Sequence, residues 1–151
     1  MLLAGVLLGV DSLSADDTKK GATDTAFKIR NEDGKLLSLA AKDWNKLPRQ
    51  QVQLKESAGN TTRYEGVSLV EVLRFAGVPF DKHLRGPRVA TYILIEAADG
   101  YRAVFALAEV DPSMTDHIVL VADRRDGKPL AESAGPYRLI VPGDKLHSRW
   151  V

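Results

Sequence analysis

EAADGYRAVF (residues 96–105) carries the clearest structural signal in this chain. The segment from Val89 to Ala97 is rich in β-branched and aromatic side chains, and Tyr101 to Ala106 alternates polar with apolar residues. Asp99-Gly100, between the two segments, favours a tight hairpin turn because both residues tolerate a positive φ angle. The sequence therefore predicts a β-hairpin centred on this dipeptide.

Short strands and turns continue from this hairpin to the C-terminus. Leu107 to Asp111 is typical of a brief helical turn. Ile118 to Ala122 and Tyr137 to Val141 have the composition of strands. Turn dipeptides follow these strands at Asp126-Gly127 and Pro142-Gly143.

A helix is predicted on the N-terminal side of the hairpin. Ser68 and Glu71 have the spacing of a capping box, in which the hydroxyl and the carboxylate bond amide groups of the first turn. Gly77 and Pro79 are typical of the end of a helix. One apolar face runs between these signals, formed by Leu69, Val72, Leu73 and Ala76. We interpret this segment as a packing helix.

The remaining N-terminal half reads as one short helix and two hairpins. Leu39 to Leu47 has apolar residues three and four apart, and Pro48 stops the helical pattern. The two hairpins are expected from residues 27–30 with 35–39 and from residues 51–56 with 61–64. Strands outnumber helices, so the predicted fold class is α+β, with mixed, mainly antiparallel β-sheets and short helices.

The composition is that of one globular domain. A chain of 151 residues buries roughly 70% of its unfolded surface, which is enough for one core without covalent staples. The formal net charge of +1 provides no field that attracts nucleic acid or an anionic membrane. The cysteine count is zero, which excludes a disulfide, a zinc-thiolate site and a cysteine nucleophile.

An apolar run occupies the N-terminus, from Leu2 to Val10. It is too short to span a bilayer, which takes about 20 apolar residues, and its length suits a secretory signal. No basic residue precedes it, so the alternative is a buried N-terminal strand or helix. We expect a signal-like segment at 1–15, a flexible linker at 16–25 and a single folded domain at 26–151. The signal predicts a periplasmic or secreted protein, and the alternative predicts a cytoplasmic one.

Side chains that often carry chemistry are scattered. The three histidines, at 83, 117 and 147, lack the spacing that would place two metal ligands on one face. Four carboxylates fall on turn-rich segments, where such groups usually bond nearby backbone amides, namely Asp123, Asp126, Glu132 and Asp144. The chain contains no nucleotide-binding or hydrolase motif.

A basic segment closes the chain. Lys145, His147 and Arg149 alternate just before Trp150. In an extended chain the three side chains would share one face, because successive residues point to opposite sides. Such a face suits a phosphate or another oxyanion, to which Arg149 could donate two hydrogen bonds. The alternative is a solvated strand edge, where lysine discourages aggregation.

Five segments in this order resemble the molybdopterin-binding domain of the sulfite oxidase family. They are YEGVSLVEVLRFAGV (64–78), VATYILIEAADGYRAVFALAEV (89–110), DGKPL (126–130), GPYRLIVPG (135–143) and Arg149-Trp150. The resemblance covers about residues 36–151. It implies a mixed α+β fold and, in active members, a molybdenum centre that transfers oxygen atoms or electrons.

The resemblance also implies a set of site residues. In that family the segment between the Val-Pro-Gly turn and the tryptophan helps to hold the phosphate arm and the pterin of the cofactor. Lys145, His147 and Arg149 occupy that segment here, and Tyr101 and Arg102 follow the Asp-Gly turn that the family shares. These five residues are the expected cofactor-binding residues, with molybdopterin as the implied cofactor.

One difference from the family decides the functional expectation. The family binds its metal through a cysteine thiolate ahead of the EGVSL helix, and residues 46–66 offer no sulfur. An oxygen ligand is a poor electronic substitute for a thiolate. We therefore expect a domain that binds a pterin or small oxyanion with weak or no redox catalysis. The alternative is a non-catalytic interaction or small-ligand-binding module of the cell envelope, with a protein partner there.

Overall fold

Two β-sheets form the framework of the chain. The computed structural model describes residues 5–9, 27–31, 33–55 and 59–151. The strands are β1 (Gly5–Gly9), β2 (Phe27–Arg30), β3 (Leu36–Leu39), β4 (Arg49–Lys55), β5 (Thr61–Ser68), β6 (Tyr92–Glu96), β7 (Arg102–Ala106), β8 (Leu120–Arg125), β9 (Lys128–Pro129) and β10 (Arg138–Ile140). The helices are α1 (Ala41–Trp44) and α2 (Leu69–Phe75), with 3-10 turns η1 (Asp81–His83), η2 (Gly86–Ala90), η3 (Leu107–Glu109), η4 (Glu132–Ala134) and η5 (His147–Arg149).

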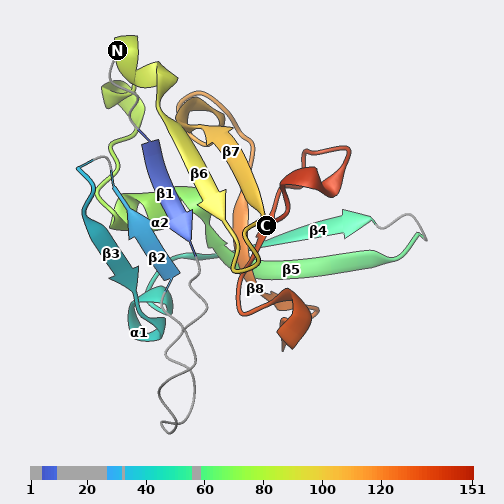
Figure 1. The fold of residues 1–151 in the computed structure, drawn as a ribbon. Helices are drawn as coiled ribbons and strands as arrows, with labels where there is room; N and C mark the ends of the chain where they lie inside the picture. The colour runs from blue at the N-terminus through green and yellow to red at the C-terminus, as the bar shows by residue number, and fades with distance from the viewer. Residues whose placement is uncertain (1–4, 10–26, 32, 56–58) are drawn as a thin grey trace, which may run out of the picture.

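The first sheet, sheet A, has the strand order β3-β2-β1-β6-β7 (Figure 1). Its pairs are antiparallel except for β1 with β6, which run parallel. Residues 5–9 of the apolar N-terminal run thus form a strand between β2 and β6, as the strand alternative predicts for them. Export of the protein stays a prediction, and the expected linker at 16–25 lies outside the described residues.

The second sheet, sheet B, is antiparallel in the order β10-β8-β5-β4, with β9 paired to β8. The register between β5 and β8 shifts at Gly66, where Glu65 pairs with Arg124 but Gly66 pairs with Ala122. Asp123 is the residue left over at this bulge. A Cβ atom added to Gly66 would lie 2.0 Å from the Val121 carbonyl oxygen, so only glycine fits there.

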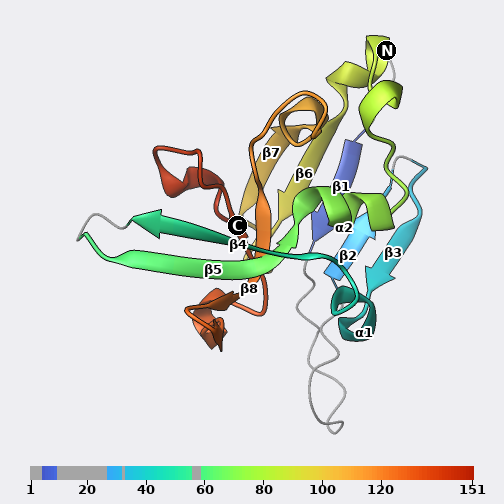
Figure 2. The same ribbon diagram turned by 180° about the vertical axis from the view of Figure 1, so that it is seen from behind.

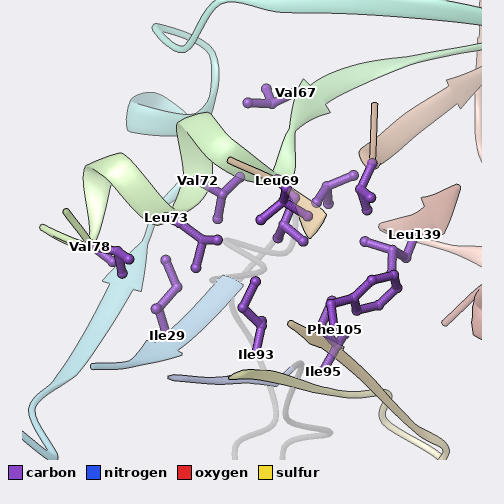
Figure 3. Packing of buried hydrophobic residues seen from close by; sticks show 14 of the residues in the cluster. Ile29, Val67, Leu69, Val72, Leu73, Val78, Ile93, Ile95, Phe105 and Leu139 are labelled. Carbon is purple, nitrogen blue, oxygen red and sulfur yellow. The ribbon is translucent and has the colours of Figure 1, made fainter. Parts of the chain in front are cut away.

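The main core lies between the sheets and around α2 (Figures 1 and 2). Figure 3 shows apolar side chains of α2 directed toward those of sheet A, with Phe105 of β7 beside Leu139 of β10. The side-chain oxygen of Ser68 accepts a hydrogen bond from the amide of Glu71 at 3.4 Å. The Glu71 carboxylate bonds Arg74 at 2.6 Å, so the cap uses the hydroxyl half of the predicted box.

Most of the predicted elements are observed. The three hairpins, both helices and the strands near residues 120 and 138 are present, and mainly antiparallel sheets with few short helices agree with the α+β prediction. None of the helices in the described ranges is long and apolar enough to cross a membrane.

Two predicted segments differ from the structure. The strand expected from Val89 begins at Tyr92, because Gly86–Ala90 form a 3-10 turn. The basic end is not extended, because the amide of Trp150 bonds the carbonyl of His147 at 3.1 Å and closes turn η5. The period-two argument for Lys145, His147 and Arg149 was therefore wrong.

Candidate functional site

A pocket of about 560 Å³ lies where the C-terminal segment passes between the two sheets. We call it the C-terminal pocket. Four parts of the chain line it: β4, the end of sheet A at β7 and η3, the segment before β8, and the segment after β10. The lining residues are Val52, Gln53, Phe105, Glu109, Asp116, His117, Ile118, Val119, Val141, Pro142, Gly143, Asp144 and Arg149.

Arg149 is held in this pocket by two carboxylates. Its Nε and Nη2 donate to the two oxygens of Asp144, at 2.9 and 2.6 Å. Its Nη1 donates to Oε1 of Glu109 at 3.2 Å. The guanidinium carbon also lies 4.5 Å from the centroid of the Phe105 ring. Arg149 is therefore fixed, and its positive charge is shared between two acidic partners.

This ion pair changes the pKa values of both partners in the expected directions. The hydrogen bonds from Arg149 hold the pKa of Asp144 below its ordinary value, although burial acts in the opposite sense. The hydrogen bonds to Asp144 raise the pKa of Arg149 above its already high value. Both groups therefore stay charged at neutral pH.

The other four predicted site residues lie outside the pocket lining. Tyr101 is 47% exposed, and its hydroxyl donates to the carbonyl of Ser148. Arg102 is paired across the hairpin with Glu96 at 2.7 Å. Tyr101 thus holds the C-terminal segment to the hairpin, and Arg102 is committed to a neighbouring strand.

The two remaining predicted residues belong to the C-terminal segment itself. The ring of His147 stacks on Trp150, with 3.7 Å between centroids and an interplanar angle of 18°. Lys145 is exposed. Of the five predicted residues, the structure brings only Arg149 into the pocket.

The pocket combines an apolar floor with an acidic rim. Phe105, Val119 and Val141 are buried and line its base. Three carboxylates, from Glu109, Asp116 and Asp144, and one guanidinium line the pocket, which gives a formal charge of −2 when His117 is counted as neutral. The pocket therefore carries an excess of negative charge.

Three of the rim residues were missed by the sequence analysis. Glu109 is the last residue of η3, and its carboxylate accepts from the amide of Ala106 at 2.8 Å as well as from Arg149. Asp116 and His117 precede β8. Sequence spacing could not predict the contact between Glu109 and Arg149, because the two residues are 40 positions apart.

A second arginine–aspartate cluster lies in sheet B away from the pocket lining. Asp123 accepts from Nη1 of Arg49 at 2.8 Å, from its Nη2 at 2.5 Å and from Nε1 of Trp44 at 2.7 Å. Burial acts to raise the pKa of Asp123, but these hydrogen bonds outweigh it and the pKa lies below its ordinary value. This cluster ties α1 and β4 to β8.

Comparison with protein families identifies the class of the domain. Residues 36–150 match the oxidoreductase molybdopterin binding domain. The chain belongs to this family. No curated protein matches it.

The side chains present do not fit the metal part of the cofactor that this family implies. In the C-terminal pocket the charge of Arg149 is already matched by Asp144 and Glu109, and the exposed Lys145 lies outside the pocket lining. A metal centre of this kind needs a thiolate, and the chain has no cysteine. Within the described part of the chain, no three His, Asp or Glu side chains form a group that could hold a metal. We derive no catalytic step through the cofactor.

Proposed function

We propose that this chain is a ligand-binding domain of the molybdopterin-binding oxidoreductase family with little or no redox catalysis. The observation that carries the proposal is the absence of cysteine from all 151 residues. Cofactors of this type perform the difficult chemistry while the protein anchors and tunes them. A chain without the anchoring thiolate keeps the scaffold but lacks the ligand that tunes the metal.

The C-terminal pocket supports the binding part of the proposal. Its volume of about 560 Å³ lies within the range of ordinary small-molecule sites. The apolar lining, of which Ile118 is the exposed part, offers apolar contact, and the rim offers several hydrogen-bond acceptors. Pterin or oxyanion binding is the specific form that the family resemblance suggests. Between these two, the acidic rim favours a pterin over an oxyanion, because it would repel an anion.

Metal and pterin analysis tests the non-catalytic part directly. The protein is purified from a host that makes the molybdenum cofactor, and bound molybdenum and pterin are measured with turnover of sulfite and of a sulfoxide. We expect molybdenum far below one equivalent and no turnover. Stoichiometric molybdenum with turnover would overturn the proposal, whereas bound pterin without metal would support its binding part.

Location in the cell envelope is a separate proposal, based on the apolar N-terminal run. Residues 5–9 of that run also form β1. Fractionation of cells followed by N-terminal sequencing of the purified protein tests it. Recovery of the protein in the cytoplasm alone would refute export, and the first residue found would show whether β1 is retained in the mature chain.

A further inference from the structure

The C-terminal pocket contains one acidic group that is not neutralised. Among the described residues, Asp116 forms no hydrogen bond or ion pair, and its side chain is exposed at the rim. By contrast, each oxygen of Asp144 accepts from Arg149. The negative charge of Asp116 must therefore be balanced by solvent or by whatever enters the pocket.

The arginine of the pocket cannot reverse this charge. Arg149 is shared between Asp144 and Glu109, so these three groups together carry a formal charge of −1. Asp116 adds a second negative charge. An anion that approached Arg149 would meet carboxylate oxygens at 2.6 and 3.2 Å from the guanidinium nitrogens. With His117 counted as neutral, the pocket lining therefore opposes anions even though it contains an arginine.

The floor below these charges is apolar. Phe105 is 1% exposed, and Val119 and Val141 are also buried. Ile118 is 44% exposed and extends the apolar surface toward the opening. A ligand that matches this pocket has an apolar body that packs on the floor and a group with N–H donors that faces the rim.

We infer that the C-terminal pocket binds a small organic cation, with an amine or amidinium group at Asp116 and an apolar body against Ile118 and the apolar floor. This inference rests on the proposed ligand-binding function and specifies its ligand class. The ammonium or amidinium donates to carboxylate oxygens in charge-assisted hydrogen bonds.

Three probes of nearly equal shape separate charge from size. Benzamidine is a planar cation, benzamide is neutral and benzoate is an anion. Their dissociation constants for the full chain are measured by titration calorimetry at low ionic strength, with inorganic phosphate as a fourth probe. We expect benzamidine to bind about tenfold more tightly than benzoate, with benzamide between them. The difference shrinks at high salt because the rim is exposed.

Two variants with the same charge change locate the effect. Asp116→Asn removes the carboxylate from the rim, and we expect the affinity for benzamidine to fall about fivefold. Asp33→Asn removes an exposed carboxylate in the turn between β2 and β3, at the edge of sheet A opposite β7, and we expect no change. Neither side chain forms a hydrogen bond or ion pair within the described residues, so both variants should fold.

The outcomes separate this inference from the proposed function. If benzoate or phosphate binds more tightly than benzamidine, the pocket binds ligands but the cation preference is wrong. Equal losses of benzamidine affinity in Asp116→Asn and Asp33→Asn would also overturn it, since the attraction would then be a property of the whole surface. If none of the probes binds at millimolar concentration, the cation inference fails, whereas the ligand-binding proposal still depends on whether pterin is bound to the purified protein.

Discussion

The two arginine–aspartate clusters of this protein are chemically alike but have different surroundings. Arg49 with Asp123 and Arg149 with Asp144 are both bidentate pairs. They are also nearly equally exposed, at 36% and 19% for the first pair and 33% and 19% for the second. Neither the bond geometry nor the exposure distinguishes the ion pair between packed elements from the one that lines the pocket.

The neighbours of each pair make the difference. Asp123 also accepts from Trp44, whose ring packs 4.7 Å from that of Tyr137, so that carboxylate is enclosed by packed elements. Asp144 and Glu109 both bind Arg149, and all three residues line the C-terminal pocket. We therefore expect changes at Asp123 to act on stability and changes at Asp144 to act mainly on binding.

The largest expected effect comes from the bulge that presents Asp123. Gly66→Ala would place a Cβ atom 2.0 Å from the Val121 carbonyl and force the β5–β8 pairing apart. We expect the free energy of unfolding to fall by about 3 kcal/mol or more. Urea denaturation followed by tryptophan fluorescence measures it. Gly143→Ala is the matched control, because its added Cβ has no neighbour within 4 Å, and a similar loss there would contradict the steric argument.

Removal of the enclosed carboxylate should have the next largest effect. Asp123→Ala leaves both Trp44 Nε1 and the Arg49 guanidinium without their acceptor. We expect a loss of about 2 to 3 kcal/mol in the free energy of unfolding, because groups that have lost a charged partner keep their desolvation cost. Thermal and urea unfolding measure this loss. A change as small as that of Asp33→Ala would show that the cluster contributes nothing to stability.

A smaller stability change should accompany the same type of substitution in the pocket. Asp144→Asn leaves Glu109 to hold Arg149, so we expect a loss of only about 1 kcal/mol. Because it also removes one negative charge from the pocket, the affinity for benzamidine should fall several-fold. Asp123→Asn should show the reverse, with lower stability and unchanged affinity. If the two variants behaved alike in both measurements, the distinction between the clusters would be wrong.

The pH dependence of stability is the smallest expected effect. The pKa values of Asp123 and Asp144 are both lowered in the folded chain, so each pair contributes stability that is complete above the unfolded pKa of about 3.9. That contribution is lost as the pH falls through the folded pKa, below about pH 4. The double variant Asp123→Asn/Asp144→Asn should therefore lose less stability than the wild type between pH 5 and 3. The measurement is the free energy of unfolding against pH for both proteins. Parallel curves would contradict the lowered pKa values of Asp123 and Asp144.

Local signals predicted the hairpins and helices well. Asp99-Gly100 forms the turn between β6 and β7, and Ser68 caps α2, because both signals act within four residues. The order of the strands was not predictable, because β1 meets β6 across most of the chain. Pairing between strands so far apart in the sequence produces no periodic pattern of residues from which it could be predicted.

The candidate site shows the same limit. Arg149 was predicted as a site residue and lines the pocket, but its commitment to Glu109 depends on a contact between distant segments. When the contact between Arg149 and Glu109 is not known, the basic residues near the C-terminus predict an anion-binding site. The acidic character of the pocket comes from η3, the segment before β8 and the segment after β10, which only the folded chain brings together.

β1 has a consequence for how the chain assembles. Without it, sheet A would consist of two separate hairpins, β2–β3 and β6–β7, which have no ladder between them. Each hairpin can form soon after its own residues are synthesised. The two hairpins become one sheet only after β6 has been made, because β1 (Gly5–Gly9) lies between them, paired with β2 on one side and in parallel with β6 on the other. Because β1 can pair with β2 before β6 is made, the parallel pairing of β1 with β6 is the step that joins the two halves of sheet A.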